Sequence, residues 1–144
     1  MLELRIRRFD TTIALPEYKT DGAAAFDLSS RIDTEIAAGA IEIIPLNVAI
    51  QLPDGYCAQL IARSSLFKKG LRLINGVGVF DADYSGNTDE YRAALQNFSS
   101  QSVSVTKGER LAQVVILPLI QCAITEVTEL SQPNRGGFGT TGTH

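Results

Sequence analysis

The chain has few of the residues on which common catalytic and metal-binding mechanisms depend. Its 144 residues include one His, two Cys and no Trp. The His is the last residue, His144, so the rest of the chain offers no base for a Ser-His-Asp or Cys-His mechanism. Cys57 and Cys122 lie in apolar, strand-like segments without a third Cys or a neighbouring His, so we expect neither a disulfide framework nor a zinc site. Chemistry in this chain therefore has to use carboxylates, hydroxyls, arginines and, where a metal takes part, a hydrated ion.

The chain also lacks an excess of basic charge and a long apolar run. Its formal net charge is −3 at pH 7, which argues against a nucleic-acid partner. The longest strongly apolar segment, 111–120, contains Gln113 and Pro118 and is too short to cross a bilayer. The N-terminal segment 3–8 is charged and strand-like, so we expect no export signal, no membrane contact and a cytoplasmic location.

Alternation of apolar and polar residues predicts strands along most of the chain. Its composition, 44% hydrophobic and 20% charged, is that of one globular domain. The segments that favour strands are 2–7, 46–52, 56–62, 92–98, 103–106, 111–119 and, with a weaker pattern, 123–130. Turn signals such as Asn75-Gly76 and Lys107-Gly108 separate them. The pattern predicts an all-β fold, either a distorted antiparallel β-barrel or a jelly-roll-like sandwich.

One segment, 63–70, breaks this alternation and predicts a short helix. Ser64 and Ser65 can cap its start, two lysines suit its C-terminal end, and Gly70 can supply a left-handed stop. Free backbone N–H groups and hydroxyls beside Arg63 would form a phosphate site. An ordinary capped surface helix is the alternative interpretation of the same residues.

The segment 78–86 places two carboxylates and an aromatic hydroxyl on a tight turn after an apolar strand. Catalytic groups concentrate on loops that a rigid sheet carries, and Asp next to Gly tolerates the backbone angles of such turns. Asp81 is therefore the first candidate for a general base. The alternative is an Asx-type turn that only caps a hairpin.

The C-terminal segment 134–144, which follows Pro133, contains four glycines, three threonines and one aromatic residue, Phe138. Such a segment cannot form a packed core, and we expect it to be mobile when no ligand is bound. We therefore divide the chain into a β-barrel domain at 1–133 and a flexible glycine-rich arm at 134–144. Glycine-rich backbone can wrap phosphates and an aromatic ring can lie on a base, whereas a disordered terminus without a function is the alternative.

Five segments resemble, in the same order, the five motifs of the trimeric dUTPase family. They are 24–28 (Ala-Ala-Phe-Asp-Leu), 62–66 (Ala-Arg-Ser-Ser-Leu), 75–86, 108–113 (Gly-Glu-Arg-Leu-Ala-Gln) and 136–142. These segments span nearly the whole chain, and the spacing between Arg63, Asn75 and Asp81 is similar to that of the family. The resemblance implies a dUTPase-like β-clip barrel and a homotrimer with shared active sites.

The resemblance also implies a reaction and the residues that perform it. Such enzymes split dUTP into dUMP and pyrophosphate by in-line attack of a water on the α-phosphorus, which lowers dUTP and supplies dUMP for thymidylate synthesis. Asp81 would activate the water, and Asp27 would bind water molecules of a hydrated Mg²⁺ that the triphosphate holds. The implied phosphate-binding residues are Arg63, Ser64, Ser65, Gln113, Arg135, Thr140 and Thr141.

Recognition of uracil and deoxyribose falls, by the same resemblance, on the hairpin 75–84. Its backbone, Gly78 included, would pair with the edge of uracil, and the Asn75 amide supplies both a donor and an acceptor. Tyr84 would pack on the deoxyribose and leave no space for a 2′-hydroxyl. Phe138 from the arm would close over the base.

The chain departs from the family pattern at several positions. Phe26 stands where the family usually has Tyr, Ser85 where it often has Arg, and Asn87 where it often has Glu. In the tail, Pro133 occupies the usual Arg position, so Arg135 either serves the terminal phosphate from a shifted register or the contact is missing.

Two alternative functions are a dCTP deaminase-like enzyme of the same fold and a catalytically silent nucleotide-binding or protein-interaction module. The first would have no use for the turn at 81–84. The intact Asp27, Arg63, Asp81 and Gln113 count against the second.

Overall fold

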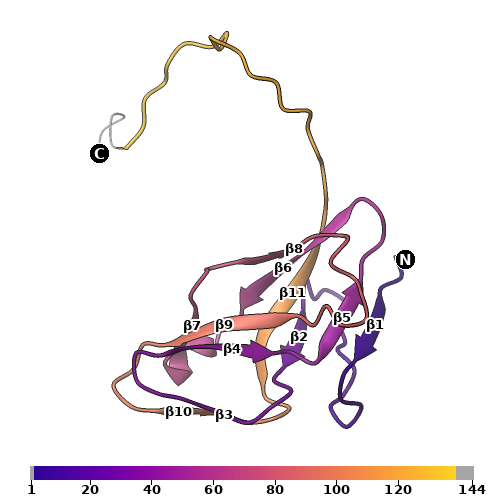
Figure 1. The fold of residues 1–144 in the computed structure, drawn as a ribbon, viewed down its shortest axis with the longest axis vertical. Helices are drawn as coiled ribbons and strands as arrows, with labels where there is room; N and C mark the ends of the chain where they lie inside the picture. The colour runs from indigo at the N-terminus through magenta and orange to yellow at the C-terminus, as the bar shows by residue number, and fades with distance from the viewer. Residues whose placement is uncertain (1, 139–144) are drawn as a thin grey trace.

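The computed structural model describes residues 2–138, and these form an all-β fold in which every strand pair is antiparallel (Figure 1). The strands are β1 Arg5–Arg8, β2 Phe26–Ser29, β3 Thr34–Ile36, β4 Ile41–Pro45, β5 Val48–Gln51, β6 Tyr56–Ala62, β7 Leu71–Leu73, β8 Gly78–Phe80, β9 Arg92–Asn97, β10 Val103–Val105 and β11 Arg110–Pro118. The all-β class predicted from the alternation is confirmed. Along the described part of the chain we find no helix whose length and apolar composition would carry it across a bilayer.

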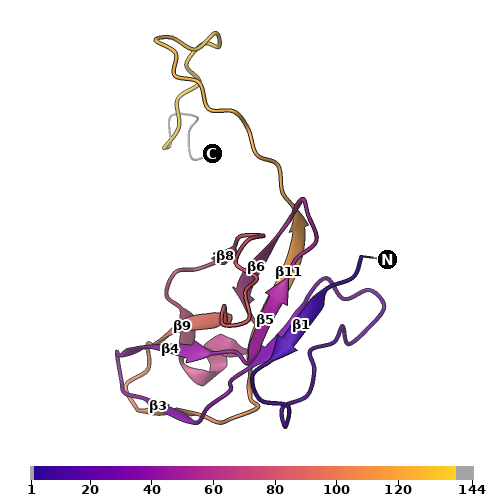
Figure 2. The same ribbon diagram turned by 45° about the vertical axis from the view of Figure 1, so that its right-hand side comes forward.

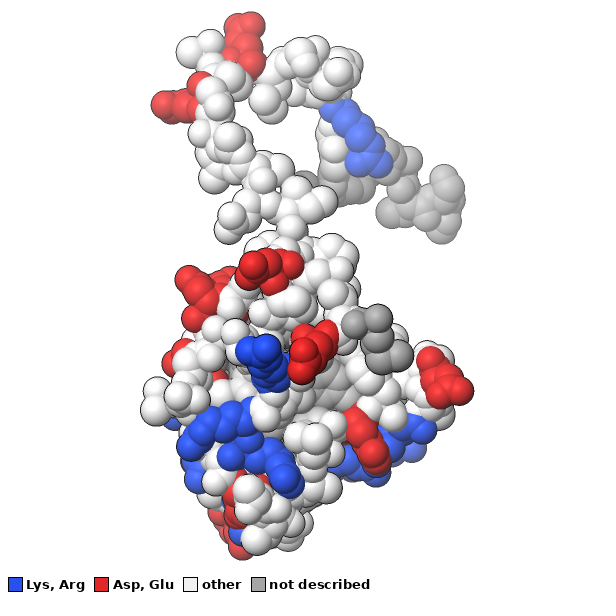
Figure 3. Space-filling view, turned by 90° about the vertical axis from the view of Figure 1, so that its right-hand side faces the viewer, with Lys and Arg blue, Asp and Glu red and all other residues white. Residues whose placement is uncertain are grey.

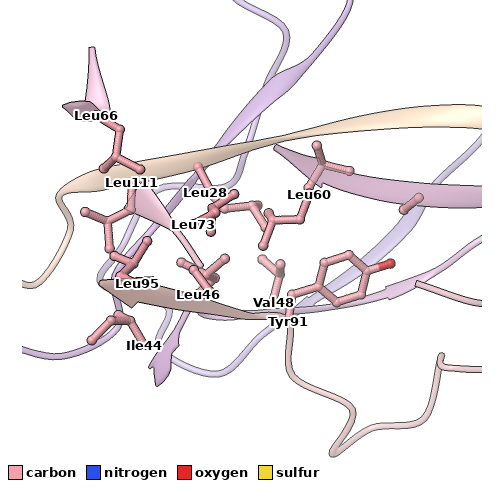
Figure 4. Packing of buried hydrophobic residues seen from close by; sticks show 14 of the residues in the cluster. Leu28, Ile44, Leu46, Val48, Leu60, Leu66, Leu73, Tyr91, Leu95 and Leu111 are labelled. Atoms are coloured by element: carbon pink, nitrogen blue, oxygen red, sulfur yellow. The ribbon is translucent and has the colours of Figure 1, made fainter. Parts of the chain in front are cut away.

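Four small sheets surround one core. The largest has the order β2-β11-β6-β8, a second has the order β4-β9-β7, and the pairs β1-β5 and β3-β10 complete the fold. In β9 alternate residues point inward, as its burial pattern shows, and Leu60 on β6 and Leu95 on β9 are almost completely buried in the core (Figure 4). Burial of one such side chain contributes about 1.5–3 kcal/mol, so the core holds the sheets together and fixes their registers.

The predicted short helix is only a 3₁₀ turn, η1, at Leu66–Lys69. Strand β6 ends at Ala62 and β7 begins at Leu71, so the connection has room for a single turn. Gly70 provides the expected left-handed stop, with φ of 81° and its N–H donating to the Phe67 carbonyl at 3.0 Å. Ser65 occupies the N-cap position without a side-chain capping bond. The prediction of a capped helix was therefore wrong, and only the turn and its stop are present.

The β-run predicted at 123–130 was also wrong, because no strand follows β11 within the described residues. Figure 1 and Figure 2 both show the chain leaving the barrel at the end of β11 and extending away from it. A strand needs a neighbouring strand to satisfy its backbone groups, and among the described residues no strand lies beside the segment that follows β11. Its apolar side chains are left in water, with Ile124 99% exposed and Leu130 84% exposed.

Candidate active site

Three neighbouring strands bring Asp27, Gln113 and Arg63 together. Asp27 on β2 lies directly opposite Gln113 on β11, and Arg63 follows the last residue of β6, which pairs with the other edge of β11. Arg63 Nε donates to Asp27 Oδ1 at 2.9 Å, and Gln113 Nε2 donates to the Ala62 carbonyl at 2.9 Å. Because β11 lies between β2 and β6, it brings these three side chains into one group, which we call the Asp27 cluster.

Arg110 belongs to the Asp27 cluster as well. Its Nη1 donates to Asp27 Oδ2 at 3.0 Å, and its backbone carbonyl accepts from Arg63 Nη1 at 3.2 Å. One carboxylate thus faces two guanidinium groups, which leaves a net positive charge suited to an anionic ligand. Arg110 lies in the motif at 108–113, but the sequence assigned it no role. It stands three residues before Gln113, at a bulge in the β11–β2 pairing, and only this pairing reveals its contact with Asp27.

Ser64 and Ser65 follow Arg63 and are exposed. Because Ser65 makes no capping hydrogen bond, its hydroxyl is not committed to the 3₁₀ turn. Backbone bonds from Leu66 to the Arg63 carbonyl, at 3.0 Å, and from Lys68 to the Ser65 carbonyl, at 3.1 Å, fix the two serines beside the guanidinium. Hydroxyls and arginine together can bind phosphate oxygens.

The turn between β7 and β8 carries Asn75, and Gly78 is the first residue of β8. The expected hairpin at 75–84 was wrong, because β7 pairs with β9 and β8 pairs with β6 in a different sheet. Gly76 has φ of 71°, a left-handed conformation that favours glycine, and its N–H donates to Leu73 at 3.2 Å. A Cβ atom added at Gly78 would lie 3.3 Å from the Leu60 Cβ and 3.8 Å from the Asn75 Nδ2. A side chain at this position would therefore crowd the space next to the Asn75 amide, and glycine keeps it open.

Asp81 begins the turn that follows β8. The turn is closed by a bond from the Tyr84 N–H to the Asp81 carbonyl at 3.1 Å, and the Tyr84 hydroxyl donates to the Glu90 carbonyl at 3.1 Å. Asp81 is exposed, and Tyr84 is 36% exposed. The carboxylate is therefore accessible to water on a turn that the sheet holds in place.

A single chain does not bring Asp81 to the Asp27 cluster. Gly78 pairs with Leu60, and β8 runs antiparallel to β6, so Asp81 lies three residues beyond this pair in one direction and Arg63 three residues beyond it in the other. Six residues at about 3.3 Å each place the two about 20 Å apart along the strand direction. The base candidate and the phosphate candidates are thus at opposite ends of β6.

The arm residues are also separate from the other candidates. Arg135 is exposed, and Phe138 is 114% exposed, so its ring contacts no part of the barrel. Figure 3 shows the arm as a mainly uncharged segment that stands clear of the barrel, on whose visible face basic and acidic side chains are interspersed. Thr140 and Thr141 lie outside the described residues.

A buried carboxylate that our sequence analysis missed lies close to the turn. Glu90 is 3% exposed and accepts from Arg31 Nε at 2.7 Å, from Arg31 Nη2 at 2.9 Å and from the Asn47 N–H at 3.0 Å. The hydrogen bonds to Glu90 raise the pKa of Arg31. Asn87, which stands where the family often has Glu, accepts a hydrogen bond at its carbonyl from Arg7 Nη1, at 3.0 Å. Glu90 is therefore the buried acidic residue of this loop.

The donor set fits a hydrated Mg²⁺ better than a protein-bound metal. Residues 2–138 contain no group of three or more His, Cys, Asp or Glu side chains placed to hold an ion. Asp27 is a single carboxylate, 17% exposed and already paired with two arginines. Mg²⁺ usually keeps several waters and is bound through one or two carboxylates plus substrate phosphates.

The arginines and serines at one end of the main sheet can bind the phosphate groups of a ligand. The chain belongs to the dUTPase family, whose sequence model matches residues 11–142. It is 40% identical over 144 residues to the deoxyuridine 5′-triphosphate nucleotidohydrolase of Nautilia profundicola, with 98% of this chain and 99% of the relative covered.

Solved structures agree with this assignment. The dUTPase of Streptococcus mutans is 36% identical with a TM-score of 0.74, covering 82% of this chain and 98% of that one. A mutant of the Staphylococcus bacteriophage 80alpha dUTPase with dUpNHpp has a TM-score of 0.86 and covers 99% of both chains. It is only 22% identical and is similar in fold alone.

Proposed function

We propose that this chain hydrolyses dUTP to dUMP and pyrophosphate with a water molecule that Asp81 activates. As a member of the dUTPase family, the chain is a dUTP diphosphatase. The observation that carries the proposal is the Asp27 cluster, in which Asp27, Arg63 and Gln113 meet from three adjacent strands as the family motifs require. A cytoplasmic location, where nucleoside triphosphates are made, fits this substrate.

Asp81 acts as the general base in this proposal. It is an exposed carboxylate on a turn, and His144 is the only histidine, so carboxylates are the available bases near neutral pH. A positioned base contributes about 10²–10⁴ to the rate. The proton of the attacking water passes to Asp81, and the new P–O bond forms as pyrophosphate leaves from the opposite side of the α-phosphorus.

Arg63, Ser64, Ser65 and Gln113 hold the phosphate oxygens. On substrate binding, Arg63 can turn from the Asp27 carboxylate to a phosphate, because Arg110 still neutralises Asp27 through its own contact at 3.0 Å. Asp27 would then accept hydrogen bonds from water molecules of a Mg²⁺ shell. Mg²⁺, when bound with the triphosphate, neutralises charge on the phosphate oxygens.

The segment 75–84 and the arm at 134–144 select the nucleoside. Backbone groups at Gly78 and the Asn75 amide pair with uracil, and mismatched donors and acceptors would cost about 1–3 kcal/mol for cytosine. Tyr84 covers the deoxyribose, and Phe138 closes over the base. The arm at 134–144 supplies further phosphate contacts from Arg135, Thr140 and Thr141, and the domain at 1–133 carries the remaining site residues.

We propose a homotrimer in which each site takes Asp81 and Arg63 from different chains. The separation of about 20 Å between them within one chain supports this assignment. Two apolar surfaces are also exposed in the single chain. One is the segment that follows β11. The other lies on or next to β4, β7 and β8 and consists of Ile41, Ile43, Ile74, Val77 and Val79, which are 41–63% exposed. Exposed apolar surface of this extent is typical of an interface between subunits.

A product assay with dUTP, dCTP, dTTP and UTP tests this function. We expect release of pyrophosphate from dUTP and at most slow release from the other three. A deaminase would release ammonia from dCTP without pyrophosphate, and a silent binding module would release neither product while retaining affinity for the nucleotide.

A further inference from the structure

A stack of two aromatic rings lies next to the turn that carries Asp81. The ring of Phe80, the residue before Asp81, is nearly parallel to the ring of Tyr91, with centroids 3.8 Å apart and an interplanar angle of 6°. Tyr91 is completely buried, and Figure 4 shows it at one end of the core beside Val48. Because β8 ends at Phe80, the turn starts from a residue whose side chain this stack holds.

The other end of the turn meets the same ring. Tyr84 is tilted against both rings of the stack, with its centroid 5.7 Å from that of Phe80 and 6.2 Å from that of Tyr91. Its hydroxyl also donates to the carbonyl of Glu90, the neighbour of Tyr91. Both ends of the turn from Asp81 to Tyr84 therefore rest on the two-residue segment 90–91.

The segment 90–91 is itself held firmly in the fold. The Tyr91 N–H donates to Val48 at 2.8 Å, and the Tyr91 carbonyl accepts from the Leu46 N–H at 2.8 Å. The preceding carboxylate, Glu90, is buried and doubly bonded to Arg31. These contacts fix the backbone of Tyr91, and complete burial confines its ring, so the ring is a rigid support.

The hydroxyl of Tyr91 has no evident use in this arrangement. It is buried without a hydrogen-bond partner among the described residues, and burial raises the pKa of Tyr91, which keeps the group protonated. A buried hydroxyl without a partner lowers stability. The part of Tyr91 that matters for the turn is therefore the aromatic ring.

We propose that Tyr91 is a positioning residue for dUTP hydrolysis, whose ring holds Phe80 and Tyr84 and, through them, the carboxylate of Asp81. The inference rests on the proposed role of Asp81 as the base. A displacement of about 1 Å at a reacting group can cost about 10²-fold in rate. Loss of the ring should accordingly lower kcat more than it raises KM.

The test compares Tyr91→Leu with Tyr91→Phe, each alone and combined with Asp81→Asn, by steady-state kinetics with dUTP. We expect Tyr91→Leu to lower kcat by about tenfold or more and to raise KM by a smaller factor, because Tyr84 also contacts the deoxyribose. Tyr91→Phe keeps the stack and should retain most of the activity. Leu95→Ala, a core truncation on β9 away from the turn, serves as the control for lowered stability.

The double variant separates positioning from a general structural role. If Tyr91 acts through Asp81, then Tyr91→Leu adds no further loss once Asp81 is Asn. An additive loss, a kcat for Tyr91→Phe as low as that for Tyr91→Leu, or an equal kcat loss in Leu95→Ala would each overturn the inference. Normal turnover of Asp81→Asn alone would refute the base instead, while the comparison of Leu with Phe still reports on the ring. Should Tyr91→Leu not fold, Phe80→Leu removes the same stack from its less buried side, with the same expectations.

Discussion

Arg31 and Glu90 form an ion pair, and removal of Arg31 should destabilise the protein more than removal of Glu90. The Glu90 side chain is 4% exposed, whereas that of Arg31 is 35% exposed. Arg31→Met keeps much of the apolar stem but leaves a buried, uncompensated carboxylate. Glu90→Gln instead leaves a guanidinium that water already reaches, together with an amide whose oxygen, in the place of Oε1, can still accept two of the three hydrogen bonds.

The magnitudes follow from this difference in exposure. Breaking a buried ion pair by removing one partner costs about 3–5 kcal/mol, and we expect about 3 kcal/mol for Arg31→Met because the site is open on the Arg31 side. A hydrogen bond to a charged group contributes about 1.5–3 kcal/mol, and partial exposure places Glu90→Gln near 1.5 kcal/mol. At about 3 °C per kcal/mol for a chain of this length, these values correspond to decreases in Tm of about 9 °C and 5 °C.

Thermal unfolding at one fixed subunit concentration measures both variants, since assembly makes Tm depend on concentration. The double variant Arg31→Met/Glu90→Gln should be more stable than Arg31→Met alone, because the amide replaces an unpaired charge. A lower Tm for Glu90→Gln than for Arg31→Met, or the lowest Tm of the three for the double variant, would contradict this account of the ion pair.

Three further outcomes follow from the site and the surface. Asp81→Asn should lower turnover by about 10²–10⁴ while binding of a non-hydrolysable dUTP analogue stays nearly unchanged, and near-normal turnover would contradict its role as the base. Arg135→Ala should weaken dUTP binding by about 1.5–3 kcal/mol and leave dUMP binding unaltered, whereas equal weakening would place Arg135 on the nucleoside or in the fold. The Lys107 ammonium, with help from Thr12, holds the pKa of Asp10 well below its usual range. Between the folded-state and the unfolded-state pKa of Asp10, the unfolded chain therefore binds more protons than the folded chain, and stability increases with pH. Asp10→Asn should therefore be less stable than the parent protein at pH 6. The difference in stability between the two proteins should shrink below about pH 4, where the carboxylate of the unfolded chain protonates. A difference in stability that grows in acid would refute this role of Asp10.

The fold class was predictable because alternating segments, such as 46–52, and apolar runs between turn signals recur along the chain. The nine-residue strand β11 and the seven-residue strand β6 are the longest of these apolar runs. Strands β2, β3, β4 and β7 were not predicted. β2 has only four residues, and β4 exposes Ile41 and Ile43 on the face away from the core, so its sequence does not alternate. Period-two analysis fails where a face is apolar without being part of the core.

The candidate site was predictable only in part, since its contacts join distant parts of the chain. The resemblance to the family supplied Asp27, Arg63 and Gln113, and β11 brings them together. Arg110 pairs with Asp27 across 83 residues, and Arg31 with Glu90 across 59, and local sequence contains no signal for either. The 3₁₀ turn at Leu66–Lys69 was mistaken for a helix because capping residues look alike in both, and the length of the connection decided the outcome.

A mixing experiment tests most directly the central claim that Asp81 and Arg63 of one active site come from different chains. Arg63→Ala and Asp81→Asn proteins, each inactive alone, are combined in equal amounts, and subunit exchange is verified by native mass spectrometry. With random exchange, about a quarter of the sites receive an intact Arg63 from one chain and an intact Asp81 from another, so dUTP hydrolysis should recover to about a quarter of the original activity. Verified mixed trimers that remain inactive would contradict the claim and return both residues to a single chain.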